Sequence, residues 1–276
     1  MDFMARALTL AASVVGKSSP NPPVGAVIVR RGTIVGEGAT QPAGHDHAEI
    51  VALKQAGVAA RGASVYVTLE PCAHQGRTPP CTDALIAAGV ASVEAATLDP
   101  SPWVNGAGVS ALRAAGIGVR VGDRACEARH LIEGYVSWAL RGRPFVTAVY
   151  AWRSVGSGEA DNVPAMGPEA RDALDLLLAG QDRVMPDVPS LLRDDPTLGS
   201  LARADVTTVA VHCDAAGLAQ LRAVGLLDRT VELQIGGPGV PVPGAGPDAG
   251  VEVRRLGADV MIVRYTEACS PASLKS

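Results

Sequence analysis

The segment from residue 47 to residue 81 holds the side chains best suited to bind a metal. His47 opens this segment, and Cys72 and Cys81 close it. One imidazole and two thiolates form a ligand set that suits zinc and leaves the fourth coordination position to water, as a catalytic zinc site requires. Glu49 lies two residues beyond His47, near the expected start of a helix, where its carboxylate could take a proton from that water and pass it to a leaving amine. The spacing therefore predicts a hydrolytic zinc site with Glu49 as proton carrier.

Two inactive arrangements of the same cysteines stay open at this stage. A closed structural zinc site needs a fourth ligand, and the candidates are His45 and His74. His45 would point away from the metal if a helix starts at His47, and His74 lies in the loop between the cysteines. The other arrangement is a pair of buried cysteines that binds no metal.

The order His-x-Glu, then Pro-Cys, then a second Cys is the pattern of zinc-dependent nucleobase deaminases. The usual spacing between the cysteines is Cys-x-x-Cys, whereas here residues 73–80 separate them. With this longer loop, the stretch from Glu70 to Cys81 resembles the deaminase half of the bifunctional riboflavin-biosynthesis deaminase/reductase family. The resemblance covers residues 1 to about 135 and includes three further matches: Pro20-Asn21-Pro22-Pro23-Val24-Gly25, Tyr66-Val67-Thr68-Leu69, and Asp99-Pro100 followed by Pro102.

The resemblance implies a three-layer α/β/α cytidine-deaminase-like domain over residues 1–140. It implies zinc held by His47, Cys72 and Cys81, with Glu49 as the catalytic residue. The implied reaction converts a diaminohydroxy-phosphoribosylamino-pyrimidine to the aminouracil nucleotide and ammonia. The residues expected to bind this substrate are Asn21, His74, Arg77, Thr78, Asp99 and Ser101.

Local sequence offers reasons for several of these substrate contacts. Prolines on both sides of Asn21 stiffen its loop, so its amide could meet a pyrimidine edge as paired donor and acceptor; the alternative is an ordinary turn asparagine. His74, Arg77 and Thr78 offer a ring, a guanidinium and a hydroxyl that suit a ribose phosphate, although Arg77 could equally be a solvated loop residue. Asp99 follows a predicted strand, the favoured position for ligand contacts in open α/β sheets.

The hydrophobic pattern of the first half alternates strands and helices. We expect helices over 2–15, 47–57, 82–88, 109–115 and 125–140, and strands over 24–29, 33–35, 64–69, 93–97 and 118–121. In the helix that begins at His47, the pattern predicts that Ile50, Val51 and Leu53 face the core.

The second half, residues 141–268, resembles the reductase half of the same family only in part. The start of the reductase half is similar to Arg143-Pro144-Phe145-Val146-Thr147, but three later family features are replaced. The family's lysine is replaced by Val149, and its Ser-x-Asp-Gly stretch by Arg153-Ser154-Val155-Gly156. Its glycine-rich turn for the dinucleotide is replaced by Asp187-Val188-Pro189-Ser190. We expect a degenerate, truncated reductase-like α/β domain without NADPH. Residues 236–250 are expected to form an exposed loop and residues 269–276 a disordered tail.

The composition of the chain limits the kinds of partner that the protein can bind. A net charge of −4 and an aromatic content of 3% argue against a nucleic-acid partner, which would need a basic groove and stacking platforms. No apolar run is long enough to span a bilayer and no secretory leader is evident, so no membrane association and a cytoplasmic location are expected. Cys126, Cys213 and Cys269 follow no disulfide spacing and are expected to be reduced. The resemblance implies a homo-oligomer that pairs through the second half.

Two alternative functions remain from the sequence. Where the family has Asp-Pro-Asn-Pro the chain has Asp99-Pro100-Ser101-Pro102, and where the family has Gly-x-Pro before the metal histidine it has Gly44-His45-Asp46. These differences admit a paralogous deaminase that acts on a related aminopyrimidine or pterin-type compound. The decayed second half also admits a non-catalytic scaffold, although all three ligands and Glu49 are intact.

Overall fold

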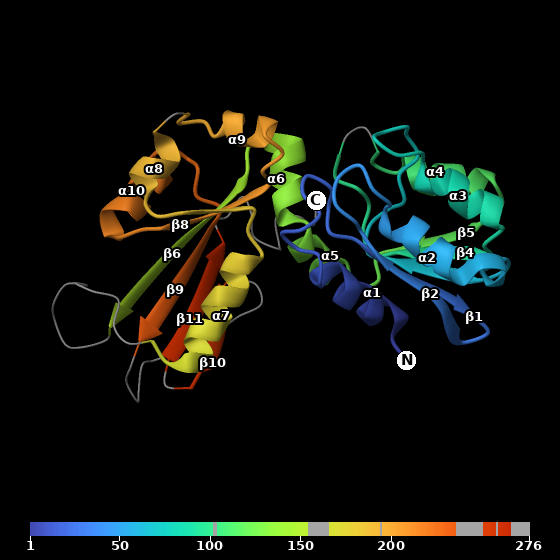
Figure 1. The fold of residues 1–276 in the computed structure, drawn as a ribbon, viewed down its shortest axis with the longest axis horizontal. Coiled ribbons are helices and arrows are strands. Elements are labelled where there is room, and N and C mark those ends of the chain that lie inside the picture. The colour runs from blue at the N-terminus through green and yellow to red at the C-terminus, as the bar shows by residue number, and fades with distance from the viewer. Residues whose placement is uncertain (102–103, 154–165, 194, 236–250, 258, 266–276) are drawn as a thin grey trace. The chain divides into compact units, whose positions relative to one another are not determined.

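Two compact units make up the chain, Met1–Gly142 and Arg143–Ser276. The structure is a computed structural model that describes residues 1–101, 104–153, 166–193, 195–235, 251–257 and 259–265 (Figure 1). Among these residues, no helix combines the length and the apolar character needed to cross a bilayer.

The first unit is built on a five-stranded sheet in the order β2-β1-β3-β4-β5. β1 pairs antiparallel with β2 and with β3, whereas β3, β4 and β5 run parallel. Its elements are α1 (Phe3–Ala12), β1 (Gly25–Arg30), β2 (Thr33–Ala39), α2 (Ala48–Ala56), the 3-10 helix η1 (Gly57–Ala60), β3 (Ser64–Val67), α3 (Cys81–Ala88), β4 (Ser92–Ala95), α4 (Ala107–Ala114), β5 (Gly118–Val121), α5 (Ala125–Leu131) and α6 (Glu133–Arg141).

Helices cover both faces of this sheet because β1, an interior strand between β2 and β3, is apolar on both sides. Ala26 and Ile28 pack in a core with residues of α2, α3 and α4. Val27 and Val29 point to the opposite face, where they pack against α1 and α5. Side chains that alternate in this way bury both faces of a strand only between two helical layers. The predicted three-layer α/β/α domain is confirmed.

The predicted core face of α2 is only partly right, because Leu53 packs against the core but the fully buried side chains are others. Its buried side chains are Ala48, Glu49, Ala52 and Ala56, whereas Ile50, Val51 and Leu53 are only half-buried. Two glycines of β2 explain the difference. A Cβ atom at Gly36 would lie 2.2 Å from the Ala52 carbonyl oxygen, and one at Gly38 would lie 2.2 Å from that of Ala48. The helix backbone therefore rests directly on the strand, and only small side chains fit between them.

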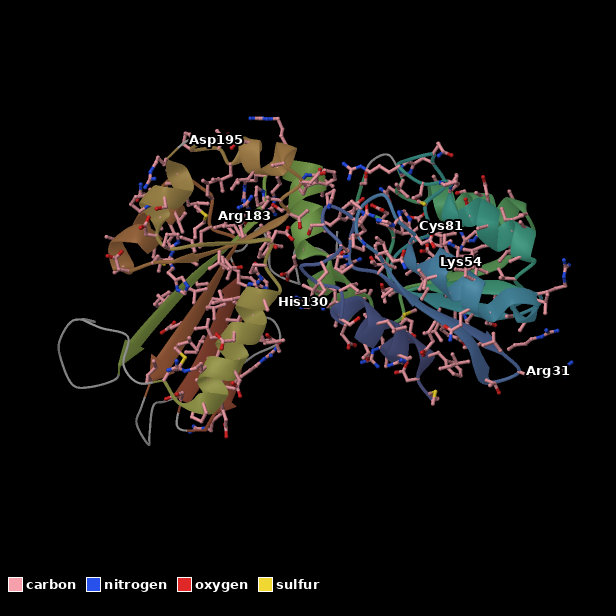
Figure 2. The ribbon with its side chains drawn as sticks, viewed as in Figure 1. Arg31, Lys54, Cys81, His130, Arg183 and Asp195 are labelled. Carbon is pink, nitrogen blue, oxygen red and sulfur yellow. The ribbon has the colours of Figure 1, made fainter. Side chains whose placement is uncertain are left out.

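Other predicted boundaries shift by a few residues. The first helix ends at Ala12 rather than at residue 15, and β2 continues from the predicted end at residue 35 to Ala39. The expected helix 125–140 is two helices, because Ile132 leaves helical geometry at φ −103° and ψ 14°. The β1–β2 hairpin has Arg31 at its exposed tip (Figure 2).

The second unit has a six-stranded sheet in the order β10-β11-β9-β6-β8-β7. β7, β8, β6 and β9 run parallel, and β11 and β10 continue the sheet in antiparallel pairing. Its elements are β6 (Phe145–Arg153), α7 (Pro168–Ala179), β7 (Arg183–Met185), α8 (Val188–Leu192), α9 (Gly199–Arg203), β8 (Thr208–His212), α10 (Ala215–Ala223), β9 (Arg229–Ile235), β10 (Val251–Leu256) and β11 (Asp259–Tyr265).

Two apolar clusters lie on opposite faces of this second sheet. One joins β6 and β8 to α8, α9 and α10, and the other joins β9 and β11 to α7. The unit is therefore also a layered α/β fold, as predicted. The predictions for Ser154-Val155-Gly156, for residues 236–250, for residues 269–276 and for Pro102 lie outside the described residues.

Candidate active site

Three side chains from separate elements converge in the first unit. His47 is the N-cap residue of α2, Cys72 follows the end of β3, and Cys81 is the first residue of α3. The Nδ1 atom of His47 lies 3.7 Å from Cys72 Sγ and 3.3 Å from Cys81 Sγ. The three donor atoms lie within 4.8 Å of one another. The protein thus brings together the three residues whose spacing predicted a metal site.

The donor set fits tetrahedral zinc. Zn–N bonds of about 2.05 Å and Zn–S bonds of about 2.3 Å put N and S about 3.6 Å apart at a tetrahedral angle. The two separations from His47 Nδ1, 3.7 and 3.3 Å, lie on either side of that value. Neither histidine considered as a fourth ligand belongs to the set: among the described residues only these three come together, and His45 and His74 are exposed.

The ionisation of Cys72 also favours the binding of a metal cation. The amide of Cys81, at the start of α3, donates to Cys72 Sγ at 3.4 Å. The hydrogen bond from the Cys81 thiol, together with that from His47, lowers the pKa of Cys72 to about 4. The pKa of Cys81 is raised, first by that same hydrogen bond and then by burial. The thiolate form of Cys72 is thus favoured, and a thiolate is the form of cysteine that binds a metal cation.

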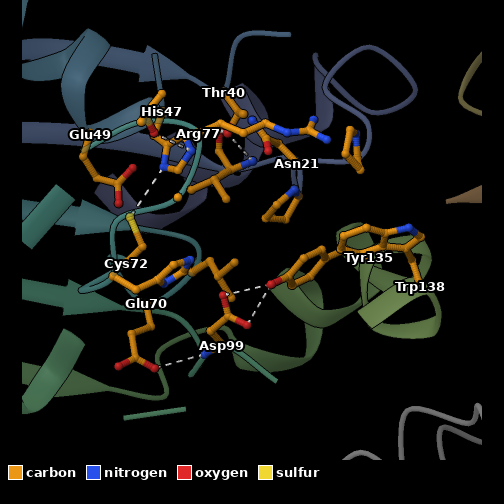
Figure 3. Close-up of a pocket in the computed structure, with 17 residues that line it drawn as sticks. Asn21, Thr40, His47, Glu49, Glu70, Cys72, Arg77, Asp99, Tyr135 and Trp138 are labelled. Carbon is orange, nitrogen blue, oxygen red and sulfur yellow. Dashed lines mark hydrogen bonds between the residues drawn. The ribbon is translucent and has the colours of Figure 1, made fainter. Parts of the chain in front are cut away.

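Glu49 is buried beside this ligand set, with 3% of its surface exposed. Figure 3 shows its carboxylate pointing toward Cys72. Burial, followed by the negative charge of Cys72, raises the pKa of Glu49 to about 7. A buried carboxyl group with such a pKa can both accept and release a proton near neutral pH.

The second ring nitrogen of His47 faces a residue expected to contact substrate. His47 Nε2 lies 3.4 Å from the Thr78 hydroxyl oxygen. Metal-binding histidines usually have a polar partner at the nitrogen that does not bind the metal, and that partner sets the orientation of the ring. Thr78 is thus in position to orient His47.

A cavity of about 220 Å³ opens beside the ligand set, and every residue that lines it belongs to the first unit. Five of the six residues expected to bind substrate line this cavity: Asn21, His74, Arg77, Thr78 and Asp99. Ser101 does not line it. Ser101 is buried, and its amide donates to Asp99 Oδ1 at 2.8 Å. The other lining residues are Pro20, Pro22, Val24, Thr40, His47, Glu49, Leu69, Glu70, Cys72, Gly76, Tyr135 and Trp138.

Sequence reasoning missed the part played by Glu70, which lies two residues before Cys72. Its Oε2 accepts hydrogen bonds from the amides of Asp99 at 3.1 Å and Gly106 at 2.9 Å, and its Oε1 accepts from Val109 at 3.0 Å. The side chain is 3% exposed. The sequence did hold a signal for this role, because Glu70 lies between an apolar strand and a cysteine ligand and is therefore expected to be buried. Charged residues are seldom buried without partners, so hydrogen bonds to Glu70 could have been predicted.

Sequence reasoning also missed Tyr135 and Trp138, both on α6. Figure 3 shows the two rings at one side of the cavity, beside Asp99. Their spacing is that of an ordinary helix face, so no local signal separated them from core residues. Only the packing of α6 brings them to the cavity.

Comparison with known proteins agrees with this geometry. The family model for the cytidine and deoxycytidylate deaminase zinc-binding region matches residues 1–97. The "Riboflavin biosynthesis protein RibD" of Aquifex aeolicus is 44% identical over 202 residues, which cover 71% of this chain and 56% of that protein. The chain spans about half the length of the first curated relatives it matches.

Two further comparisons define the family. The structure of the Thermotoga maritima deaminase/reductase superposes with a TM-score of 0.78 at 25% identity, covering 96% of this chain and 98% of that one, so the predicted reductase-like fold of the second unit is confirmed. The "Diaminohydroxyphosphoribosylamino-pyrimidine deaminase" of Buchnera aphidicola is 45% identical over 142 residues, 97% of its length. The chain therefore belongs to the family of riboflavin-biosynthesis pyrimidine deaminases, which carry a cytidine-deaminase-type zinc-binding region.

Proposed function

We propose that this protein is a zinc-dependent hydrolase that deaminates an aminopyrimidine ribonucleotide in riboflavin biosynthesis. The product would be the corresponding aminouracil nucleotide and ammonia. One observation carries the proposal: the donor atoms of His47, Cys72 and Cys81 converge beside buried Glu49, on the wall of a cavity large enough to admit a pyrimidine ring. The name of the Buchnera relative supports the choice of substrate class.

Zinc bound to these three ligands would supply the Lewis acidity that makes water a nucleophile near neutral pH. Glu49 is the proton carrier in this proposal. Its carboxylate accepts one proton from water as the oxygen bonds to the amine-bearing ring carbon, and it passes that proton to the adjacent ring nitrogen. It then carries the remaining hydroxyl proton to the amine nitrogen as the carbon–nitrogen bond breaks. Water thus replaces the amino group with a carbonyl oxygen and releases ammonia. The burial of Glu49 supports this role, because bulk water would otherwise compete for the proton.

The remaining cavity residues supply the substrate contacts in this proposal. Asn21 meets the pyrimidine edge with its amide, and Asp99 lies across the cavity from it (Figure 3). His74 and Arg77 belong to the exposed loop between the cysteines and are proposed to hold the ribose phosphate. Thr78 orients His47, and Ser101 acts through its amide hydrogen bond to Asp99 and through its side chain, which hydrogen-bonds Tyr135.

We further propose that the second unit performs no nicotinamide chemistry. After β7, the Asp187 side chain accepts the Ser190 amide at 2.6 Å; after β8, the Asp214 side chain accepts the Gly217 amide at 2.7 Å. These carboxylates occupy helix N-termini at the carboxyl ends of parallel strands, where phosphates bind in dinucleotide folds. Val149 is buried among apolar residues where the family carries a lysine. All three features support the loss of reductase function.

The test is ammonia release by the purified full chain with aminopyrimidine nucleotides. The diaminopyrimidinone ribonucleotide should release one ammonia per molecule, and Glu49→Gln should retain zinc but release none. Rapid deamination of a different aminopyrimidine or a pterin, with none of this nucleotide, would instead identify the paralogous deaminase. Tightly bound zinc without deamination of any tested compound would support the scaffold alternative.

A further inference from the structure

The carboxylate of Asp99 is held in place by a tyrosine from α6. The Tyr135 hydroxyl donates to Asp99 Oδ1 at 3.1 Å and to Oδ2 at 3.3 Å (Figure 3). The Ser101 amide donates to Oδ1 at 2.8 Å, and the backbone amide of Asp99 is bound in turn by Glu70. Asp99 is 6% exposed and lines the cavity. Its carboxylate therefore has a fixed orientation at the cavity wall.

These hydrogen bonds determine what the wall offers to a ligand. A tyrosine hydroxyl has one proton, and here Tyr135 directs it at Asp99, while the Ser101 side chain hydrogen-bonds the same hydroxyl. An ionised carboxylate has acceptor sites only, about four in number, and the two donors fill only part of them. Asp99 thus presents hydrogen-bond acceptors to the cavity, which match the N–H edge of an aminopyrimidine.

A purely structural role is the competing explanation for Tyr135. Its ring packs against the main core of the first unit, and it stacks with Trp138 at a centroid distance of 6.2 Å and an interplanar angle of 29°. These contacts need the ring and not the hydroxyl. The hydroxyl is directed at a residue of the cavity wall, where its contribution can be measured separately from that of the ring.

We propose that Tyr135 is a positioning residue that holds the Asp99 carboxylate in the orientation that accepts the N–H donors of the substrate. The inference rests on the proposed deamination. Tyr135 touches no reacting atom and acts through Asp99. Because its hydrogen bond orients the carboxylate before substrate arrives, losing the hydroxyl should weaken substrate binding more than it slows the chemical step.

The experiment compares Tyr135→Phe with Tyr66→Phe in the full chain. Tyr66 lies on β3 outside the cavity, with its ring 5.2 Å from that of Phe3, so its variant removes a hydroxyl remote from the site. Tyr135→Phe should raise KM about tenfold or more, the effect of a hydrogen bond to a charged group. Its kcat should fall less than about threefold, and its melting temperature should match that of Tyr66→Phe. Tyr66→Phe should leave KM and kcat unchanged.

A double-mutant cycle with Asp99→Asn tests whether Tyr135 acts through Asp99. The double variant should bind substrate no more weakly than Asp99→Asn alone, with Kd measured calorimetrically in a Glu49→Gln background that cannot turn over. An unchanged KM in Tyr135→Phe, or losses that simply add, would overturn the inference while wild-type deamination still supported the proposed function. Failure of the wild-type chain to bind or deaminate the nucleotide would overturn both.

Discussion

Glu70 Oε2 accepts the backbone amide of Asp99 at 3.1 Å, across 29 positions of sequence. The same carboxylate binds the amides of Gly106 and Val109. Glu70 stands two residues before the ligand Cys72, and Asp99 lines the cavity. One buried side chain therefore ties the segment that carries a metal ligand to the segment that carries a proposed substrate contact.

Replacing Glu70 should destabilise the first unit. Glu70→Ala leaves three backbone amides without their acceptor, and we expect the free energy of unfolding to fall by on the order of 3 kcal/mol or more. Glu127→Ala is the control, because Glu127 forms an exposed ion pair with Arg124 and should change stability by less than about 1 kcal/mol. Urea unfolding of both full-length variants measures the difference. Equal stabilities would refute the anchoring role of Glu70.

Removal of one thiolate should release the metal. Cys72→Ala should lose both zinc and activity, since it takes away one of three converging ligands, whereas Glu49→Gln should keep zinc and lose only turnover. Cys126→Ala removes an exposed thiol of α5 and should keep both. Metal content by elemental analysis, measured beside ammonia release, gives the answer. Full zinc content in Cys72→Ala would disprove the ligand assignment.

Arg77 should matter mainly for the phosphate group. Arg77→Ala should lower kcat/KM for the phosphorylated nucleotide by a factor that corresponds to about 1.5 to 3 kcal/mol. The kcat/KM for the dephosphorylated form should change little. The matched change is Arg31→Ala, at the exposed tip of the β1–β2 hairpin (Figure 2). Equal losses on the two substrates would remove Arg77 from the phosphate site.

The pH dependence of substrate binding should report on Asp99. Burial raises the pKa of Asp99, and so does the nearby charge of Glu70; the Ser101 amide, the Tyr135 hydroxyl and His74 oppose that rise. Tyr135→Phe removes one stabiliser of the ionised form, so the pKa of Asp99 should rise further. Binding should then be lost at a higher pH as the solution is acidified. Kd measured against pH in the Glu49→Gln background tests this. If Tyr135→Phe lost substrate binding at the same acidic pH as the chain that keeps Tyr135, the prediction would be contradicted.

NADPH should not stabilise the second unit. A ligand at a hundred times its Kd adds about 2.7 kcal/mol to the stability of the domain that binds it. Asp187 and Asp214 already occupy the helix N-termini that would meet its phosphates, so millimolar NADPH should leave the melting profile unchanged. The pyrimidine nucleotide should stabilise the first unit in the same assay. A shift with NADPH, or its consumption in the presence of the deaminated product, would establish a working reductase.

The metal site could be predicted because its information is local. His47, Glu49, Cys72 and Cys81 lie within 35 residues, and side-chain type with short spacing is enough to indicate zinc chemistry. The alternation of apolar segments likewise indicated a layered α/β fold, since a sheet that is apolar on both faces needs helices on each side. Asn21, His74, Arg77 and Asp99 came from the resemblance, and all four line the cavity.

Tertiary packing alone decided the rest of the site. Tyr135 reaches Asp99 across 36 positions, and Thr78 reaches His47 across 31, and no pattern within one helix or loop encodes such contacts. The buried face of α2 was predicted only in part for the same reason. Hydrophobicity favoured its large side chains, but two glycines on β2 bring the helix backbone so close to the strand that alanines lie between them. Periodicity describes one segment at a time, whereas close packing depends on the shape of both surfaces.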